Sequence, residues 1–118
     1  MIRGVSLYLE DIVSAINKIE KYTKRLSFNR LKKDEKTIDA VIRNLEIIGE
    51  AAKHLPKQIK EKYFNIPWKE IVGMRNKVIH EYFGVDVDIL WGTINEDIPD
   101  LKRKIRELKS TIDKVHIR

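Results

Sequence analysis

Four side chains that can bind an anion or move a proton lie close together in the segment from Gly73 to Gly84. Arg75 carries a permanent positive charge and a planar fork of N–H donors that matches phosphate oxygens. Asn76 adds an amide beside it, and Tyr82 adds a hydroxyl. Histidine side chains can both accept and donate a proton near neutral pH, so His80 is a candidate acid or base. These residue types allow anion binding and acid–base chemistry.

The spacing of these residues predicts that one helix carries them, with Pro67 at its first position and Gly84 at its end. At about 100° per residue, Arg75 and Tyr82 lie within about 20° of each other, whereas His80 lies about 140° from Arg75. One regular helix therefore does not direct Arg75 and His80 at one point. Convergence requires the length of the arginine, a widened helical turn or a second copy of the segment. The structural alternative is that His80 and Tyr82 are bundle residues with satisfied polar tips and that Arg75 pairs with an acidic neighbour.

Other candidates for chemistry are scarce. His54 stands at the end of a predicted helix, where an imidazole often complements the helix C-terminus, and His116 lies two residues from the end of the sequence. The histidines are isolated and the chain has no cysteine, so the sequence predicts no metal site. No glycine-rich phosphate loop occurs either, and we expect no bound cofactor.

Amphipathic periodicity predicts the helices that position this segment. The first helix is expected to have Ser6 as its cap and to end near Lys24, and Ser27 is expected to cap the next helical segment. A second long helix is expected to end before Pro56, and Asp86 is expected to cap the last helix. The apolar stripes of the first two long helices are Leu9, Ile12, Val13, Ile16 and Ile19, and then Ile38, Val41, Ile42, Leu45, Ile48, Ala52 and Leu55.

The C-terminal segment has the most regular pattern. Its apolar residues alternate four- and three-residue steps, as in a heptad seam, and Pro99 is expected to kink or divide this helix. Two interpretations of the seam remain open: it closes the core of one copy, or it buries part of its length against a second copy. The nearby basic run Lys102, Arg103, Lys104 and Arg106 is typical of a solvated helix face. The seam consists of Val87, Trp91, Ile94, Ile98, Leu101, Ile105, Leu108, Ile112 and Val115.

The composition supports an all-α fold. The chain of 118 residues has 42% apolar and 36% charged residues, with only five glycines and three prolines. Such a shortage of turn formers favours long helices, and we expect an up-and-down antiparallel bundle of four to five helices in a single domain over residues 1–118. No apolar run is long enough to span a membrane, which predicts a cytoplasmic protein. The net charge of +6 attracts polyanions without specifying one.

Several blocks of residues, taken in order, resemble the HepT-like branch of the HEPN superfamily. The central motif Arg-x-x-x-x-His-x-Tyr is matched by Arg75, His80 and Tyr82 without departure. The resemblance covers nearly the whole chain, and the blocks that carry it besides the central motif are Tyr8–Ile12, Leu26–Phe28, Asp34 with Thr37, Ala40–Lys53, Ile66–Trp68, Gly73–Asn76, His80–Asp86, Leu90–Trp91 and Asp97–Pro99.

The resemblance implies an all-helical domain that dimerises and acts as a metal-independent RNA endonuclease, the toxin of a type VII-like toxin–antitoxin pair. The implied partners are RNA, a second copy of the chain and a nucleotidyltransferase antitoxin. That antitoxin is thought to use ATP and Mg²⁺ to transfer AMP onto the tyrosine of the motif, here Tyr82. Arg75 and His80 are the implied catalytic residues. The chemistry of its amide makes Asn76 a supporting residue, which either donates a hydrogen bond to the same phosphate oxygens or orients Arg75.

The implied reaction requires two groups that transfer protons, one as a base and one as an acid. Attack by a ribose 2′-hydroxyl needs a proton acceptor, a proton donor for the leaving 5′-oxygen and positive charge on the phosphorane. One histidine does not easily fill both proton roles, so a dimer that shares one cleft would supply the second. The alternative function is a non-catalytic HEPN partner or substrate-binding subunit of a minimal nucleotidyltransferase, in which Arg75 and His80 bind nucleotide without cleaving RNA.

Overall fold

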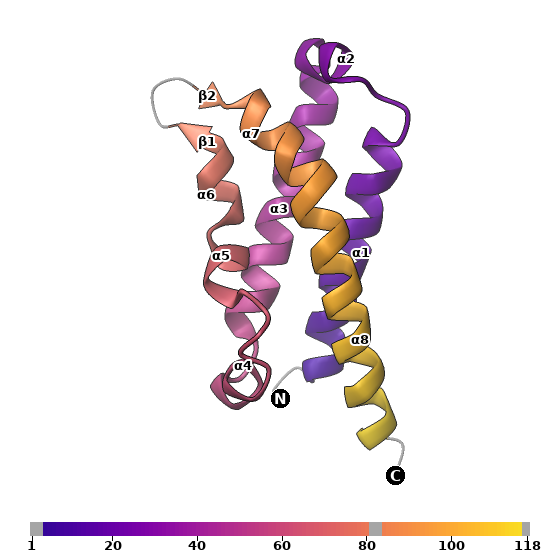
Figure 1. The fold of residues 1–118 in the computed structure, drawn as a ribbon, viewed down its shortest axis with the longest axis vertical. Coiled ribbons are helices and arrows are strands. Elements are labelled where there is room, and N and C mark those ends of the chain that lie inside the picture. Colours follow the sequence, from indigo (N-terminus) through magenta and orange to yellow (C-terminus); the bar gives the residue numbers. More distant parts are fainter. Residues whose placement is uncertain (1–3, 81–83, 117–118) are drawn as a thin grey trace.

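The computed structural model describes residues 4–80 and 84–116, and this part of the chain is predominantly helical, as predicted. Figure 1 shows the chain passing up α1, down α3, up again through α5 and α6, and down through α7 and α8. The elements in order are α1 (Val5–Thr23), α2 (Phe28–Lys33), α3 (Glu35–His54), α4 (Lys57–Lys62), α5 (Trp68–Val72), α6 (Met74–Val78), β1 (Ile79–His80), β2 (Gly84–Val85), α7 (Val87–Gly92), the π-helical turn η1 (Thr93–Asp97) and α8 (Ile98–His116).

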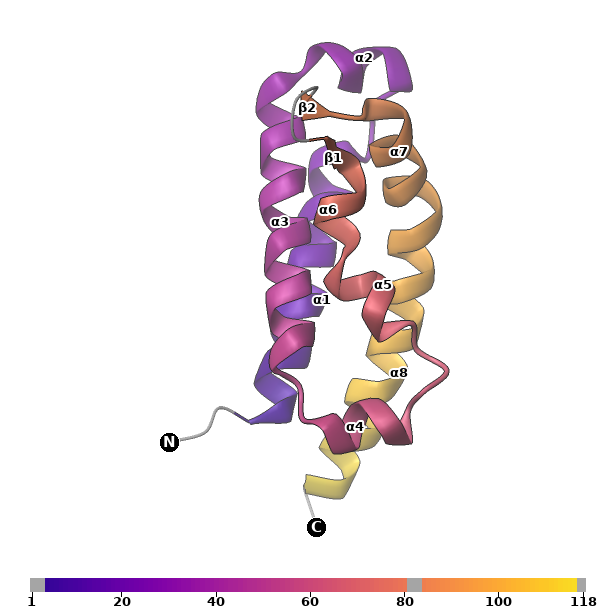
Figure 2. The ribbon, with the colours of Figure 1, turned by 90° about the vertical axis from the view of Figure 1, so that its left-hand side faces the viewer.

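The core lies between the three long helices. The apolar stripes of α1, α3 and α8 face one another, and their central side chains are fully buried. The short helices α5 and α6 cover the remaining side, where they pack on α3 (Figure 2). Over residues 4–80 and 84–116, no helix combines the length and the apolarity needed to cross a bilayer. The largest fully buried side chains are Leu9, Ile12, Ile16, Ile19, Leu31, Val41, Leu45, Ile48, Val78, Leu90, Ile98 and Ile105.

Two of the three predicted N-caps are confirmed. The Ser27 hydroxyl accepts a hydrogen bond at the start of α2, and the Asp86 carboxylate accepts the backbone N–H of Ile89 at the start of α7. The prediction for Ser6 is wrong, because α1 begins one residue before it with Gly4 as N-cap. Ser6 instead points across to α8, where its hydroxyl donates to the Asp113 carboxylate over 2.7 Å.

The predicted single helix from Pro67 to Gly84 is also wrong. In the structure the helical segment begins at Trp68, is interrupted at Gly73 and ends at Val78. Ile79 has extended backbone angles, and Ile79 and His80 pair antiparallel with Val85 and Gly84. Two features of the backbone favour this turn between β1 and β2. The N–H of Asp86 donates to the Val78 carbonyl, and Gly84 adopts a positive φ of 77°. Side chains other than glycine adopt such an angle only at a cost.

The α-helical pattern is interrupted just before Pro99, where a kink or division was expected, and the interruption is a π-helical turn. Proline has no N–H to give to the carbonyl four residues before it, so the α-helical ladder is broken here in any case. Immediately before it, the N–H of Ile98 reaches back five residues to the Thr93 carbonyl, which is the π-helical pattern. Helical backbone angles continue on both sides of η1, so α7, η1 and α8 form one helical run.

The C-terminal seam closes the core of its own chain. Every seam residue from Ile94 to Ile112 is at least nine-tenths buried within one copy, and Trp91 is partly buried and packs against the core. The first of the two interpretations therefore holds from Trp91 to Ile112. Val115 lies outside the residues whose side chains are described.

Candidate active site

Helix α6 carries two of the predicted site residues side by side. Arg75 is partly exposed on the surface of this helix, and one of its terminal nitrogens donates to the Asn76 side-chain oxygen over 3.3 Å. The guanidinium Nε points the other way, toward α3, and is shielded from solvent. The structure thus brings Arg75 and Asn76 together, as the sequence analysis expected.

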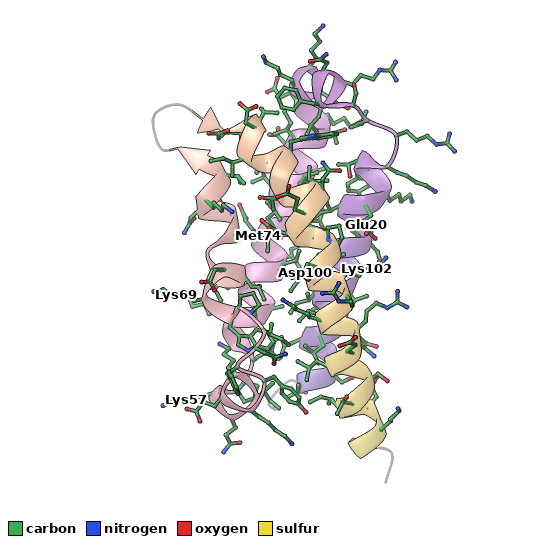
Figure 3. The ribbon with its side chains drawn as sticks, in the orientation of Figure 1. Glu20, Lys57, Lys69, Met74, Asp100 and Lys102 are labelled. Atoms are coloured by element: carbon green, nitrogen blue, oxygen red, sulfur yellow. The ribbon has the colours of Figure 1, made fainter. Side chains whose placement is uncertain are left out.

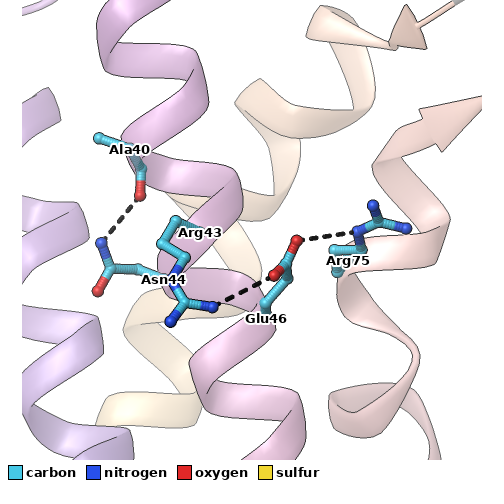
Figure 4. A network of polar contacts seen from close by, with 5 residues as sticks. All are labelled: Ala40, Arg43, Asn44, Glu46 and Arg75. Atoms are coloured by element: carbon cyan, nitrogen blue, oxygen red, sulfur yellow. Dashed lines mark hydrogen bonds and ion pairs between the residues drawn. The ribbon is translucent and has the colours of Figure 1, made fainter.

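Glu46 of α3 joins this pair across the helix interface (Figure 4). Its Oε1 lies 3.4 Å from Arg75 Nε, and its Oε2 lies 3.4 Å from a terminal nitrogen of Arg43. Next to Arg43, Asn44 turns into the core, where its amide donates to the Ala40 carbonyl. The Arg75–Glu46 distance is that of an ion pair and is longer than a well-formed hydrogen bond. The acidic neighbour expected under the structural alternative for Arg75 is therefore present.

A groove runs between α3 and the α5–α6 segment, with Arg75 and Asn76 on its wall. It encloses about 460 Å³ and is also lined by Glu46, Glu50 and Lys53. The two backbones meet closely at Gly49, where a Cβ atom would lie 3.0 Å from the Val72 carbonyl oxygen. The groove therefore has a rigid floor and a mixed rim of two cations and two carboxylates.

The backbone of His80 lies in β1, which follows α6 directly. The 140° separation between Arg75 and His80 assumed one regular helix, and it no longer applies because the helix ends at Val78. The 20° separation between Arg75 and Tyr82 fails for the same reason. The His80 side chain and the whole of Tyr82 lie outside the described residues.

Of the two remaining histidines, His54 has contacts typical of a structural residue. His54 lies in the last turn of α3, where its Nδ1 is 2.7 Å from the Glu50 carbonyl and its ring stacks on Tyr8. This agrees with its expected role at a helix C-terminus. His116 is placed only by its backbone. Within the described ranges, no group of three or more histidine, aspartate or glutamate side chains is arranged to hold a metal ion.

Three of the four cations of the basic run on α8 contact carboxylates. Lys102 contacts Glu20 of α1 over 2.7 Å (Figure 3), and both Arg103 and Lys104 contact Asp100. The hydrogen bond from Lys104 lowers the pKa of the Asp100 carboxyl. These pairs agree with the expectation of a solvated face, in which surface charges pair with one another.

Sequence reasoning gave no role to Glu46. It stands on the partly exposed side of a long amphipathic helix, where glutamate is ordinary, and nothing in its spacing separates it from Glu50. Only the packing of α6 on α3 brings it to Arg75. Its sole signal was membership of the Ala40–Lys53 block, which carries the resemblance.

Comparison with known proteins assigns the family. A family model described as "Ribonuclease HepT-like" matches residues 12–108. A protein of Thermococcus cleftensis named "Probable ribonuclease HepT" is 53% identical over 102 residues, which cover 86% of this chain and 93% of that protein. A protein of Caldanaerobacter subterraneus subsp. tengcongensis named as a "Putative RNase" is 48% identical over 86% of this chain and 90% of its own length. A protein of Methanocaldococcus jannaschii named in the same way is 42% identical over 87% of this chain and 94% of its own length. No solved structure matches. The chain therefore belongs to the ribonuclease HepT-like family.

Proposed function

We propose that this chain is a metal-independent RNA endonuclease whose site is built around Arg75, Asn76 and His80. The observation that carries the proposal is the Arg75–Asn76 pair on the wall of an open groove, in a chain whose relatives are named as ribonucleases. A guanidinium that is partly exposed at the wall of a groove is available to a phosphate in a way that a buried one is not.

The proposed reaction uses the RNA's own 2′-hydroxyl as the nucleophile. Its oxygen forms a bond to the adjacent phosphorus, the bond from phosphorus to the 5′-oxygen breaks, and a 2′,3′-cyclic phosphate remains. One group removes the proton from the 2′-hydroxyl and another protonates the leaving 5′-oxygen, and His80 fills one of these roles. Arg75 stabilises the charge on the phosphorane, and Asn76 holds the guanidinium or bonds the same oxygens.

We further propose that two copies of the chain form the working unit. A homodimer that shares one cleft supplies a second His80 and a second Arg75, so that one histidine acts as base and the other as acid. The need for two proton-transfer groups supports this proposal. The C-terminal seam does not, because its described side chains are buried within one copy or packed on that copy's core.

In the cell, we propose that the chain acts in the cytoplasm as the toxin of a toxin–antitoxin pair. The antitoxin is a nucleotidyltransferase that uses ATP and Mg²⁺. The Tyr82 oxygen attacks the α-phosphorus of ATP, pyrophosphate leaves, and the hydroxyl proton is lost to a base. The added phosphodiester carries a negative charge that competes with RNA for Arg75.

The test is cleavage of RNA by the purified chain. We expect Arg75→Ala and His80→Ala each to lose at least about 100-fold in rate, because each removes a phosphate or proton contact of the transition state. EDTA should change the rate little. Lys77→Ala is the matched control, since Lys77 stands on the same helix and pairs with Asp97 instead of Glu46.

The outcomes separate the proposal from the non-catalytic alternative. Cleavage that persists in His80→Ala, or that EDTA abolishes, contradicts the assignment. RNA or nucleotide binding without cleavage by the wild-type chain supports the nucleotidyltransferase-subunit alternative instead.

A further inference from the structure

The ion pair between Arg75 and Glu46 does little for the stability of the fold. The two side chains are 42% and 38% exposed, and pairs of this exposure typically contribute little because water and salt screen them. Helix α6 is anchored instead by the buried side chains of Met74 and Val78. The contact therefore calls for another explanation.

Among the described residues, the contacts of Arg75 use Nε and one terminal nitrogen of the guanidinium. Glu46 faces Nε, the nitrogen nearest the chain, and Asn76 accepts a hydrogen bond from one terminal nitrogen. These two contacts lie on two different edges of the planar guanidinium. The other terminal nitrogen has no protein partner among the contacts of the described residues.

Each carboxylate oxygen of Glu46 faces an arginine. Arg43 contacts its second oxygen, one turn earlier on α3, and offsets part of its negative charge. The close approach of backbones at Gly49 fixes α3 against the segment that leads into α6. A carboxylate held in this way can orient a neighbouring guanidinium without attracting it away from a phosphate.

We propose that Glu46 is a positioning residue that orients the Arg75 guanidinium toward the scissile phosphate. This inference rests on the proposed RNase function. The long 3.4 Å contact fits such a role, because contacts in a site without substrate are often long and tighten when the substrate binds. Glu46 acts on the orientation of Arg75 and therefore on the rate of the bound complex more than on RNA affinity.

The test measures kcat and KM separately for a short RNA. In Glu46→Ala we expect kcat to fall about tenfold or more, since small misplacements of a reacting group are costly, while KM changes less than about threefold. Glu46→Gln keeps an oxygen in the same place and should recover most of kcat. Asp97→Ala is the matched control: it removes a carboxylate from a comparably exposed ion pair with the other cation of α6, and it should change neither constant.

Three results would overturn the proposal. The first is a Glu46→Ala variant with a lower KM and an unchanged kcat, which would mean that Glu46 competes with RNA for Arg75. The second is unchanged kcat and KM. The third is a Glu46→Gln variant as impaired as Glu46→Ala, because an acceptor in the same place would then not be enough. A wild-type chain that cleaves no RNA would instead reject the proposed function, and this inference with it.

Discussion

At the scale of single residues, Asp34 controls the start of the helix that carries Glu46. Its carboxylate accepts the backbone N–H of Thr37 over 3.0 Å and the Thr37 hydroxyl over 2.7 Å. These hydrogen bonds hold the pKa of the Asp34 carboxyl below its usual range, and the bond from the Thr37 hydroxyl has the larger effect. A carboxyl with a lowered pKa in the folded state stabilises the fold above its unfolded pKa of about 3.9, and this contribution disappears as pH falls through the folded pKa.

Asp34→Ala should therefore lower Tm by a few degrees at pH 7, and the gap from wild type should narrow as the pH falls below about 4. Thermal unfolding followed by circular dichroism between pH 2 and 7 measures this. Asp39→Ala, on an exposed position of the same helix, is the control and should leave Tm nearly unchanged. A gap that stays constant down to pH 2 would show that the charge of Asp34 contributes nothing.

The residue scale also shows where the sequence was informative about the site. Arg75, Asn76 and His80 stand out because their chemistry is scarce elsewhere in the chain. Glu46 does not stand out, because the chain has eighteen acidic residues and its partner lies far away in sequence. Its significance comes from three-dimensional packing alone.

At the scale of elements, the close approach of α3 and α5 holds the groove together. Gly49→Ala would place a methyl group 3.0 Å from the Val72 carbonyl oxygen, which is backbone and cannot swing aside. The overpacking cost of about 1–3 kcal/mol should outweigh the gain of about 1 kcal/mol in helix propensity. Gly92→Ala is the matched control, because Gly92 is helical and faces open space, so this variant should gain up to about 1 kcal/mol.

Chemical denaturation measures both stabilities, and RNA cleavage measures the effect on the site. Because Val72 leads through Gly73 to Arg75, Gly49→Ala should also reduce cleavage in protein that is still folded. A Gly49→Ala variant as stable and as active as Gly92→Ala would mean that α5 can move away from α3 without consequence.

The long helices were predictable and the end of α6 was not, for a clear physical reason. The apolar stripes of α1, α3 and α8 repeat over many turns, and such a long helical period fits no other secondary structure well. Met74, Val78 and Tyr82 continue the same four-residue step past the end of α6. What ends the helix is a hydrogen bond from Asp86, eight residues beyond Val78, and the left-handed backbone of Gly84. The hydrogen bond from Asp86 has no local signature in the sequence, and Gly84 signals the end of a helix without showing that the helix ends six residues earlier.

At the scale of the whole molecule, the proposed dimer must use a surface other than the C-terminal seam. We expect a mass near twice 13.9 kDa by sedimentation at micromolar concentration. A shared site also predicts that one defective chain inactivates its partner: in a mixture of wild-type and His80→Ala chains, refolded together, each mixed dimer has only one His80, so activity should fall more steeply than the fraction of wild-type chains. A fully active monomer, or an activity that falls only in proportion to the fraction of wild-type chains, would reject the shared site.

The proposed silencing by AMP tests how regulation connects to the site. Tyr82 stands in sequence between His80 and Gly84, whose backbones pair, so both ends of its segment are tied to the strand that leaves α6. Incubation with the cognate nucleotidyltransferase, ATP and Mg²⁺ should therefore add one or more AMP units to wild type and abolish RNA cleavage, because the new charge competes for Arg75. Intact-mass measurement should find no addition on Tyr82→Phe, which should keep cutting RNA in the presence of the transferase. Tyr63→Phe is the control for a tyrosine outside the motif, and it should be modified and silenced like wild type. If Tyr82→Phe is modified and silenced equally, the switch lies at another residue and the tyrosine of the motif serves the fold.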